Sequence, residues 1–150
     1  MRLVIQRVKQ ASVSVAPDYF RRIDGGLMVL VGIENGDTPD DVAWLVKKTI
    51  DLRIFNDDQG IMNRSVLDTG GAILAISQFT LLASTRKGNR PSYINSAPPA
   101  VAEPLYRQYC EGLEAAGVAI VERGIFGADM DVSLINHGPV TIIIDSRLRF

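Results

Sequence analysis

The chain has 150 residues, and its 16 Lys and Arg against 17 Asp and Glu give a formal net charge of −1 at pH 7. This length suits a single domain, and 47% hydrophobic with 22% charged residues indicates a globular chain rather than a disordered one. The charge balance excludes a strongly basic nucleic-acid-binding protein and a polybasic membrane anchor.

The contents of Cys, His and apolar residues exclude further classes. One Cys and one His rule out an intrachain disulfide and leave too few ligands for a Cys/His zinc site. No apolar run approaches the roughly 20 residues of a membrane span, and no long apolar stretch like that of a signal peptide follows Met1. We therefore expect a cytoplasmic protein that does not contact a membrane.

Alternating and continuous apolar runs predict that much of the chain forms strands. The continuous run over residues 27–33 is typical of a strand covered on both faces. The other expected strands are 2–8, 12–15, 52–55, 72–82, 118–121, 130–136 and 140–144, the last two joined by a tight turn at His137-Gly138-Pro139.

Two amphipathic helices are expected between the strands. The first begins after Thr38, a good N-cap, and Asp41 completes a capping box. The second begins near Pro99, with Pro104 in its first turn and Gly117 as its C-terminal cap. Two helices and many strands predict a layered α/β domain.

The segment Ser77-Gln78-Phe79-Thr80-Leu81 interrupts a strongly apolar predicted strand with two hydroxyls and an amide. Such a pattern is typical of the solvent face of a half-buried strand. It also fits a strand end that offers hydroxyl, amide and backbone N–H groups to a polar substrate. The pattern alone leaves both interpretations open.

The segment Asn136-His137-Gly138-Pro139-Val140-Thr141 also has two interpretations. Gly and Pro are common in a tight hairpin connection. A Gly-Pro peptide can also adopt the cis form at modest cost, and the sequence leaves the isomer open. In the cis form two adjacent carbonyl oxygens point in one fixed direction, where they could gauge a small group of a substrate.

Positive charge gathers in an irregular segment over residues 83–98. No acidic residue lies between Asp68 and Glu103, whereas this segment holds Arg86, Lys87 and Arg90. A solvated loop and a phosphate-binding rim both fit this distribution. Elsewhere, Cys110 is expected to pack as a small hydrophobe and His137 to lie in a turn. No GxGxxG or P-loop motif is present, and no cofactor or metal is expected.

Together these motifs resemble those of the D-aminoacyl-tRNA deacylases. The Ser77–Leu81 segment matches one family signature, and Gly138-Pro139-Val140-Thr141, preceded by Asn136, matches the other. Supporting stretches occur in family order along nearly the whole chain: Val4-Ile5-Gln6-Arg7-Val8, Leu52-Arg53-Ile54-Phe55, Met62-Asn63, Lys87-Gly88-Asn89-Arg90-Pro91-Ser92 and Phe126-Gly127-Ala128.

The resemblance implies one domain over residues 1–150 with a three-layer β/β/α fold, mostly antiparallel strands and two main helices, residues 146–150 forming a C-terminal tail. It implies a homodimer that hydrolyses the ester of D-aminoacyl-tRNA and rejects L-aminoacyl-tRNA, with glycyl-tRNA as a second candidate substrate. A cis Gly138-Pro139 peptide would enter the pocket of the partner subunit and exclude L-amino acids.

The resemblance also implies roles for individual residues. The backbone groups of Phe79 and Thr80 would lie at the scissile ester, while the terminal 2′-hydroxyl of the tRNA activates water. Arg7 would help to hold the dipeptide in place. The remaining matches are Ser77 and Gln78 in the catalytic segment, Met62 and Asn136 at the substrate, and Arg86, Lys87 and Arg90 at the tRNA.

Three alternatives remain beside this interpretation. Thr80 could be a covalent nucleophile, although the sequence shows no base for it. The protein could be a noncatalytic tRNA-binding module. It could also be a general esterase that uses Thr80 or Ser77 with His137.

Three features depart from the family pattern. His137 stands where Asp is usual, residues 16–22 do not resemble the expected short hairpin, and the tail extends past the usual end. Because none of them replaces a signature residue, activity is expected to be retained.

Overall fold

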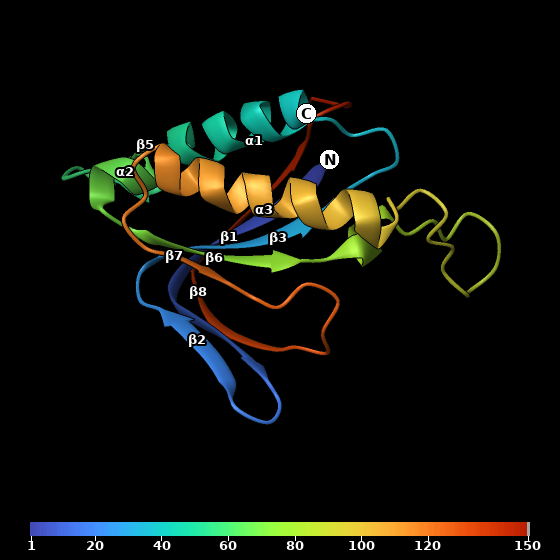
Figure 1. Ribbon diagram of the computed structural model, residues 1–150. Helices are drawn as coiled ribbons and strands as arrows, with labels where there is room; N and C mark the ends of the chain where they lie inside the picture. The colour runs from blue at the N-terminus through green and yellow to red at the C-terminus, as the bar shows by residue number, and fades with distance from the viewer. Residues whose placement is uncertain (150) are drawn as a thin grey trace.

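The computed structural model describes residues 1–149, and Figure 1 shows their arrangement. Helices α1 and α3 lie side by side over one face of a sheet, and the sheet bends away below them. The elements are β1 (Arg2–Val15), β2 (Tyr19–Ile23), β3 (Gly26–Gly32), α1 (Pro39–Asp51), β4 (Phe55–Asn56), β5 (Met62–Arg64), α2 (Val66–Thr69), β6 (Ala72–Ser77), the 3-10 turn η1 (Phe79–Leu82), α3 (Pro99–Ala115), β7 (Val121–Arg123) and β8 (Asp131–Asp145).

The main sheet has the strand order β2-β1-β3-β6-β7, and β8 pairs with β1. Strand β1 is antiparallel to all three of its neighbours, whereas β3, β6 and β7 run parallel to one another. The first half of β1 pairs with β3 and the second half pairs with β2. On its other edge, β1 pairs with β8 along both halves. One continuous sheet therefore supplies two layers, and the helices supply the third, as the β/β/α expectation requires.

The core has two parts, one on each face of the central strands. Leu27 and Val29 of β3 face the helices and pack with the fully buried Leu45 and Tyr109. Met28, between them in sequence, faces the second β layer, because successive side chains of a strand alternate between its faces. The prediction that residues 27–33 are covered on both faces is confirmed.

The two predicted helices are present, with one correction. Helix α1 has the predicted capping box, in which the Thr38 N–H donates to the Asp41 carboxylate at 2.9 Å. Pro104, however, lies beyond the first turn of α3, so that prediction was wrong. The carbonyl that Pro104 leaves without an N–H donor belongs to Ala100, an exposed residue that water can reach. Gly117 follows the C-cap with φ 106°, and its N–H donates to the Glu114 carbonyl.

Several predicted strand limits were wrong because pairing continues through local irregularities. The separate strands at 2–8 and 12–15 are one strand, β1, and those at 130–136 and 140–144 are one strand, β8. The expected hairpin at His137-Gly138-Pro139 is absent, and this segment lies in β8, where the register against β1 shifts. A bulge that keeps both strands paired replaces the turn.

Three other segments differ from prediction. The strand expected at 72–82 ends at Ser77 and gives way to η1, and the ones at 52–55 and 118–121 shift to β4 and β7. The short α2 was not predicted, although the capping box of Ser65 and Asp68 signals it. No helix of residues 1–149 is long and apolar enough to span a membrane.

Candidate active site

A cavity of about 520 Å³ lies at the carboxyl ends of the parallel strands β3 and β6. Its wall includes Val31, Ile76 and Ser77 from these strands, Pro99 at the start of α3 and Phe126 from the segment after β7. Ligands bind preferentially at this edge of parallel strands. The Ser77–Phe79 part of the first signature belongs to this wall.

The first signature is a strand end, not a strand face. Ser77 ends β6, and the Gln78 N–H donates to the Val31 carbonyl at 2.8 Å before the chain turns into η1. Gly32 makes room for this turn, since a Cβ there would lie 2.5 Å from Leu82 Cδ2. As the first residues of the turn, Phe79 and Thr80 have N–H groups without partners inside it. The structure therefore favours the interpretation in which a strand end presents backbone donors.

Side chains around η1 are arranged for packing and hydrogen bonding rather than for activating a nucleophile. The Thr80 hydroxyl accepts a hydrogen bond from the Gln78 amide at 2.5 Å, and an amide is not a base. The Ser96 hydroxyl donates to the Phe79 carbonyl at 3.0 Å. The Phe79 ring, 56% exposed, meets Tyr93 edge to face at 5.0 Å between centroids.

The second signature is built around Arg7. This side chain is buried, and its guanidinium donates to the His137 carbonyl at 2.9 Å and to the Ile54 carbonyl at 2.6 Å. The Gly138-Pro139 peptide is cis, and both residues are exposed. Gly138 has φ 127°, and a Cβ on it would lie 2.8 Å from Arg7 Nη2. Only glycine fits here, and Arg7 holds the backbone on which the dipeptide projects.

The Gln6 side chain contacts the residues on both sides of the same dipeptide. Gln6 was not among the predicted site residues. Its carbonyl oxygen Oε1 accepts from Asn136 Nδ2 at 2.8 Å and lies 3.4 Å from Thr141 Oγ1. Asn136 and Thr141 stand on either side of the dipeptide, so one amide ties both flanks to β1. The available signal was its place beside Arg7, within the Val4–Val8 stretch.

The two signatures lie far apart within one chain. Arg7 pairs with Leu27 near the start of β3, whereas Ser77 pairs with Val31 near its end. Gly138 lies in β8 at the level of Arg7, about four residues along the strand direction from the level of Ser77. Crossing the sheet from β8 through β1 and β3 to β6 adds three strand spacings, so Gly138 and Ser77 are about 20 Å apart. The structure therefore brings together the members of each signature but does not bring the two signatures to one place.

The other predicted site residues occupy separate positions. Met62 lies exposed in β5, opposite Asn56 of β4. Arg86, Lys87 and Arg90 are exposed on the loop that extends beyond the carboxyl end of β6, at the right of Figure 1. This loop leaves the sheet next to η1, at the cavity end of the molecule.

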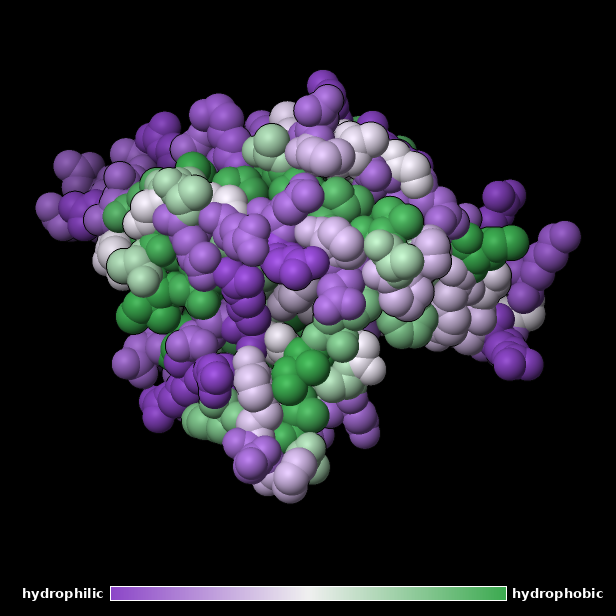
Figure 2. All heavy atoms as spheres, viewed as in Figure 1, coloured by the Kyte–Doolittle hydropathy of each residue, from purple (hydrophilic) through white to green (hydrophobic). Residues whose placement is uncertain are grey.

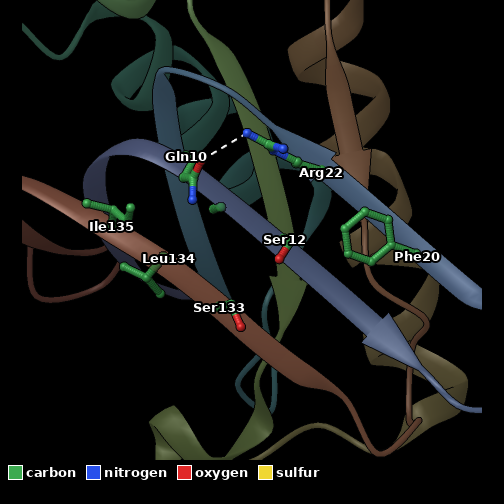
Figure 3. A pocket seen from close by; sticks show the side chains of 8 residues that line it. Gln10, Ser12, Phe20, Arg22, Ser133, Leu134 and Ile135 are labelled. Carbon is green, nitrogen blue, oxygen red and sulfur yellow. Dashed lines mark hydrogen bonds between the residues drawn. The ribbon is translucent and has the colours of Figure 1, made fainter.

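A second, smaller hollow of about 230 Å³ lies on the outer face of β1, β2 and β8 (Figure 3). Arg22 donates to Gln10 there at 2.9 Å, and Phe20 lies further along β2. Ser12 and Ser133 complete its polar lining. None of the predicted site residues lines it.

Cys110 and His137 have no visible part in the pocket. Cys110 is fully buried in α3, and burial raises its thiol pKa to about 11, so the expectation of a packed small residue is confirmed. His137 is exposed in β8, at the end of the molecule where Arg7 lies, so it is not beside Ser77 or Thr80 of its own chain.

The chain is similar to known proteins in both sequence and fold. The family model described as D-Tyr-tRNA(Tyr) deacylase matches residues 4–145. Proteins called D-aminoacyl-tRNA deacylase from Parabacteroides distasonis and Chromobacterium violaceum are 53% and 54% identical over 147 residues, 98% of each chain. The solved c-Myc DNA Unwinding Element Binding Protein has 38% identity and a TM-score of 0.91, covering 97% of this chain and 98% of its own. A probable eukaryotic D-amino acid tRNA deacylase shares the fold at 18% identity and a TM-score of 0.80, covering 95% and 97%. The chain therefore belongs to the D-Tyr-tRNA(Tyr) deacylase family.

Proposed function

We propose that the protein is a hydrolase that cleaves the ester of D-aminoacyl-tRNA, releasing the free D-amino acid and tRNA. The observation that carries this proposal is the strand-end turn beside the cavity, where Phe79 and Thr80 offer backbone N–H groups. A cavity of about 520 Å³ has room for a terminal adenosine with its amino acid. The names of the relatives support the same substrate class.

The proposed chemistry uses the substrate's own reactivity. An aminoacyl ester is already activated, so two N–H donors at the developing oxyanion and correct positioning supply much of the catalysis. As water forms the new C–O bond, it passes a proton to the terminal 2′-hydroxyl oxygen of the tRNA, and the proton of that hydroxyl moves to the 3′-oxygen. The ester C–O bond breaks as the 3′-oxygen takes up this proton. Thr80 needs no nucleophilic role, in keeping with its hydrogen bond to the Gln78 amide.

We further propose that two copies of the chain form a homodimer in which each Gly138-Pro139 enters the partner's pocket. Within one chain the dipeptide and Ser77 are about 20 Å apart, so a site that uses both needs a second copy. Apolar residues reach the surface over the bent sheet below the helices (Figure 2), and Ile135 and Ile143 of β8 are each 49% exposed. Such a surface is suited to burial against a second copy. The proposed dimer predicts twice the mass of one chain in solution.

In this arrangement the dipeptide acts as a steric filter at the α-carbon. An L-amino acid would direct its side chain into the rigid dipeptide, whereas a D-amino acid would direct it away. Glycine has no side chain to exclude, so glycyl-tRNA is proposed as a second substrate.

The tRNA is proposed to contact the loop that holds Arg86, Lys87 and Arg90. These side chains are exposed next to the cavity end of β6, where they can neutralise phosphates near the acceptor end. Because the charge of the whole chain nearly cancels, the contact is expected to be small. Charged tRNA is a cytoplasmic substrate, and we place the reaction there.

A paired deacylation assay tests this proposal. Purified protein is incubated with D-tyrosyl-tRNA and, separately, with L-tyrosyl-tRNA, and the released tyrosine is measured. We expect release from the D-ester and almost none from the L-ester. Lys47→Ala, on the exposed face of α1 and away from the proposed site and dimer surface, is a control expected to behave as the wild type. Equal release from both esters would refute the steric filter, and no release would favour a binding module. Loss of all turnover in His137→Ala would favour the general esterase.

A further inference from the structure

Arg147 in the C-terminal tail forms ion pairs and a hydrogen bond with the loop formed by residues 34–37. Its guanidinium lies 3.4 Å from Glu34 Oε2 and 3.3 Å from Asp37 Oδ1. It also donates to the Asn35 carbonyl. The planar guanidinium of Arg147 thus contacts three acceptors on one short loop. Because its donors have a fixed geometry, these contacts determine the position of the loop better than a single ion pair would.

The acceptor Asp37 is a fixed point rather than a mobile surface group. Its side chain is fully buried, and it accepts from the α-amino group of Met1 at 2.7 Å and from the Glu34 N–H at 2.6 Å. The same amino group donates to Ser146 at 3.0 Å. The residue preceding Arg147 is therefore anchored in the same cluster, and Arg147 cannot drift far from the loop.

The far side of this loop is bonded to the segment 93–97. The Asn35 backbone N–H donates to the Asn95 carbonyl at 2.9 Å, and its side-chain amide donates to the Ile94 carbonyl at 2.9 Å. Next to these bonds, the Ala97 N–H donates to the Ile33 carbonyl at 3.0 Å. The loop lies between the tail and this segment and touches both.

The segment 93–97 in turn supports the cavity wall. Ser96 and Ala97 line the cavity, and Ser96 donates to the Phe79 carbonyl. Tyr93 packs against the Phe79 ring. An unbroken series of contacts thus runs from Arg147 through the loop to Ser96 and Phe79 in the cavity wall.

We propose that Arg147 is a positioning residue for the substrate pocket, acting through the loop 34–37 on the segment 93–97. The inference rests on the proposed function for its kinetic readout. Arg147 lies outside residues 4–145, the part of the chain that the family model matches. The proposal gives the C-terminal tail a role in shaping the pocket.

The test compares Arg147→Ala and Arg147→Lys with the wild-type protein. Arg149→Ala is the matched control, because Arg149 lies in the same tail but contacts the Ser146 carbonyl and the Trp44 ring instead of the loop. Arg147 is 41% exposed, so its contacts are partly screened, and Arg147→Ala is expected to raise KM for D-tyrosyl-tRNA about three- to tenfold. Since no reacting atom is touched, kcat should stay within about twofold.

Hydrogen–deuterium exchange supplies a readout that needs no activity. In Arg147→Ala we expect faster exchange in segments 33–37 and 93–97, and Arg147→Lys should restore most of both effects. Glu34→Gln, which keeps the side-chain shape, should change KM in the same direction. Exchange that quickens only in the tail, an unchanged KM with a lower Tm, or an equal effect of Arg149→Ala would each overturn the proposal. Absence of turnover in the wild type would refute the proposed function, while the exchange data would still decide the role of Arg147.

Discussion

Gly138→Ala is the substitution whose consequence follows most directly from the geometry. The added Cβ would lie 2.8 Å from Arg7 Nη2 and 3.0 Å from Val140 Cγ2. Arg7 cannot simply yield, because it is buried and donates to the carbonyls of His137 and Ile54. The φ of 127° adds strain, since an L-residue there costs about 1–3 kcal/mol. We therefore expect the free energy of unfolding to fall by about that amount and the dipeptide to shift.

Two measurements on this variant check the reasoning. Urea denaturation should show the lost stability, and the paired assay should show a D-to-L rate ratio lower by about tenfold or more, because a misplaced filter loses steric discrimination. Gly60→Ala is a suitable control. Gly60 also has a positive φ, but a Cβ there meets nothing within 4 Å. The control should lose about 1 kcal/mol and keep the wild-type ratio. A Gly138→Ala protein with wild-type stability and ratio would refute the argument.

Three further predictions concern separate groups. Thr80→Ala should keep activity within about tenfold of the wild type, because its hydroxyl is bonded to an amide; a loss of about a thousandfold in a folded variant would indicate a nucleophile. Cys110 should not react with an aromatic disulfide reagent at pH 8 until the chain is unfolded, because burial raises its pKa to about 11; rapid native labelling would contradict the packing. Burial alone would raise the pKa of Asp145, but N–H donors from the tail and the Arg2 guanidinium lower it below its ordinary value of 3.8. Its stabilisation is therefore full above about pH 4 and is lost as the pH falls toward the lowered pKa, so urea unfolding of Asp145→Asn should vary less with pH in this range.

Local signals in the sequence were sufficient for elements that depend on neighbouring residues. The capping box of Thr38 and Asp41 and the doubly covered run 27–33 needed no information from distant segments, and both were predicted. The bulge at Gly138 was not, because it arises from the register of β8 against β1. The local sequence around a Gly-Pro pair does not distinguish a turn from a bulged strand of this kind.

The candidate site shows the same division. The signature segments could be recognised from residue type and order, but their separation within one chain could not, because it follows from the pairing of β1 with β3 and of β3 with β6. The contact of Arg7 with the His137 carbonyl joins residues 130 positions apart. The contacts of Arg147 with the loop 34–37 likewise exist only in the folded chain. The sequence of the tail alone does not predict them.

The central claim of this account is that the dipeptide of one copy completes the pocket of another. A mixture of two single-cysteine variants, His137→Cys and Phe79→Cys, treated with a short bismaleimide, tests it directly. The native Cys110 is buried and should not interfere. We predict a covalent dimer in the mixture that is absent from either variant alone. No covalent dimer, although both introduced thiols react with a monofunctional maleimide, would contradict the claim.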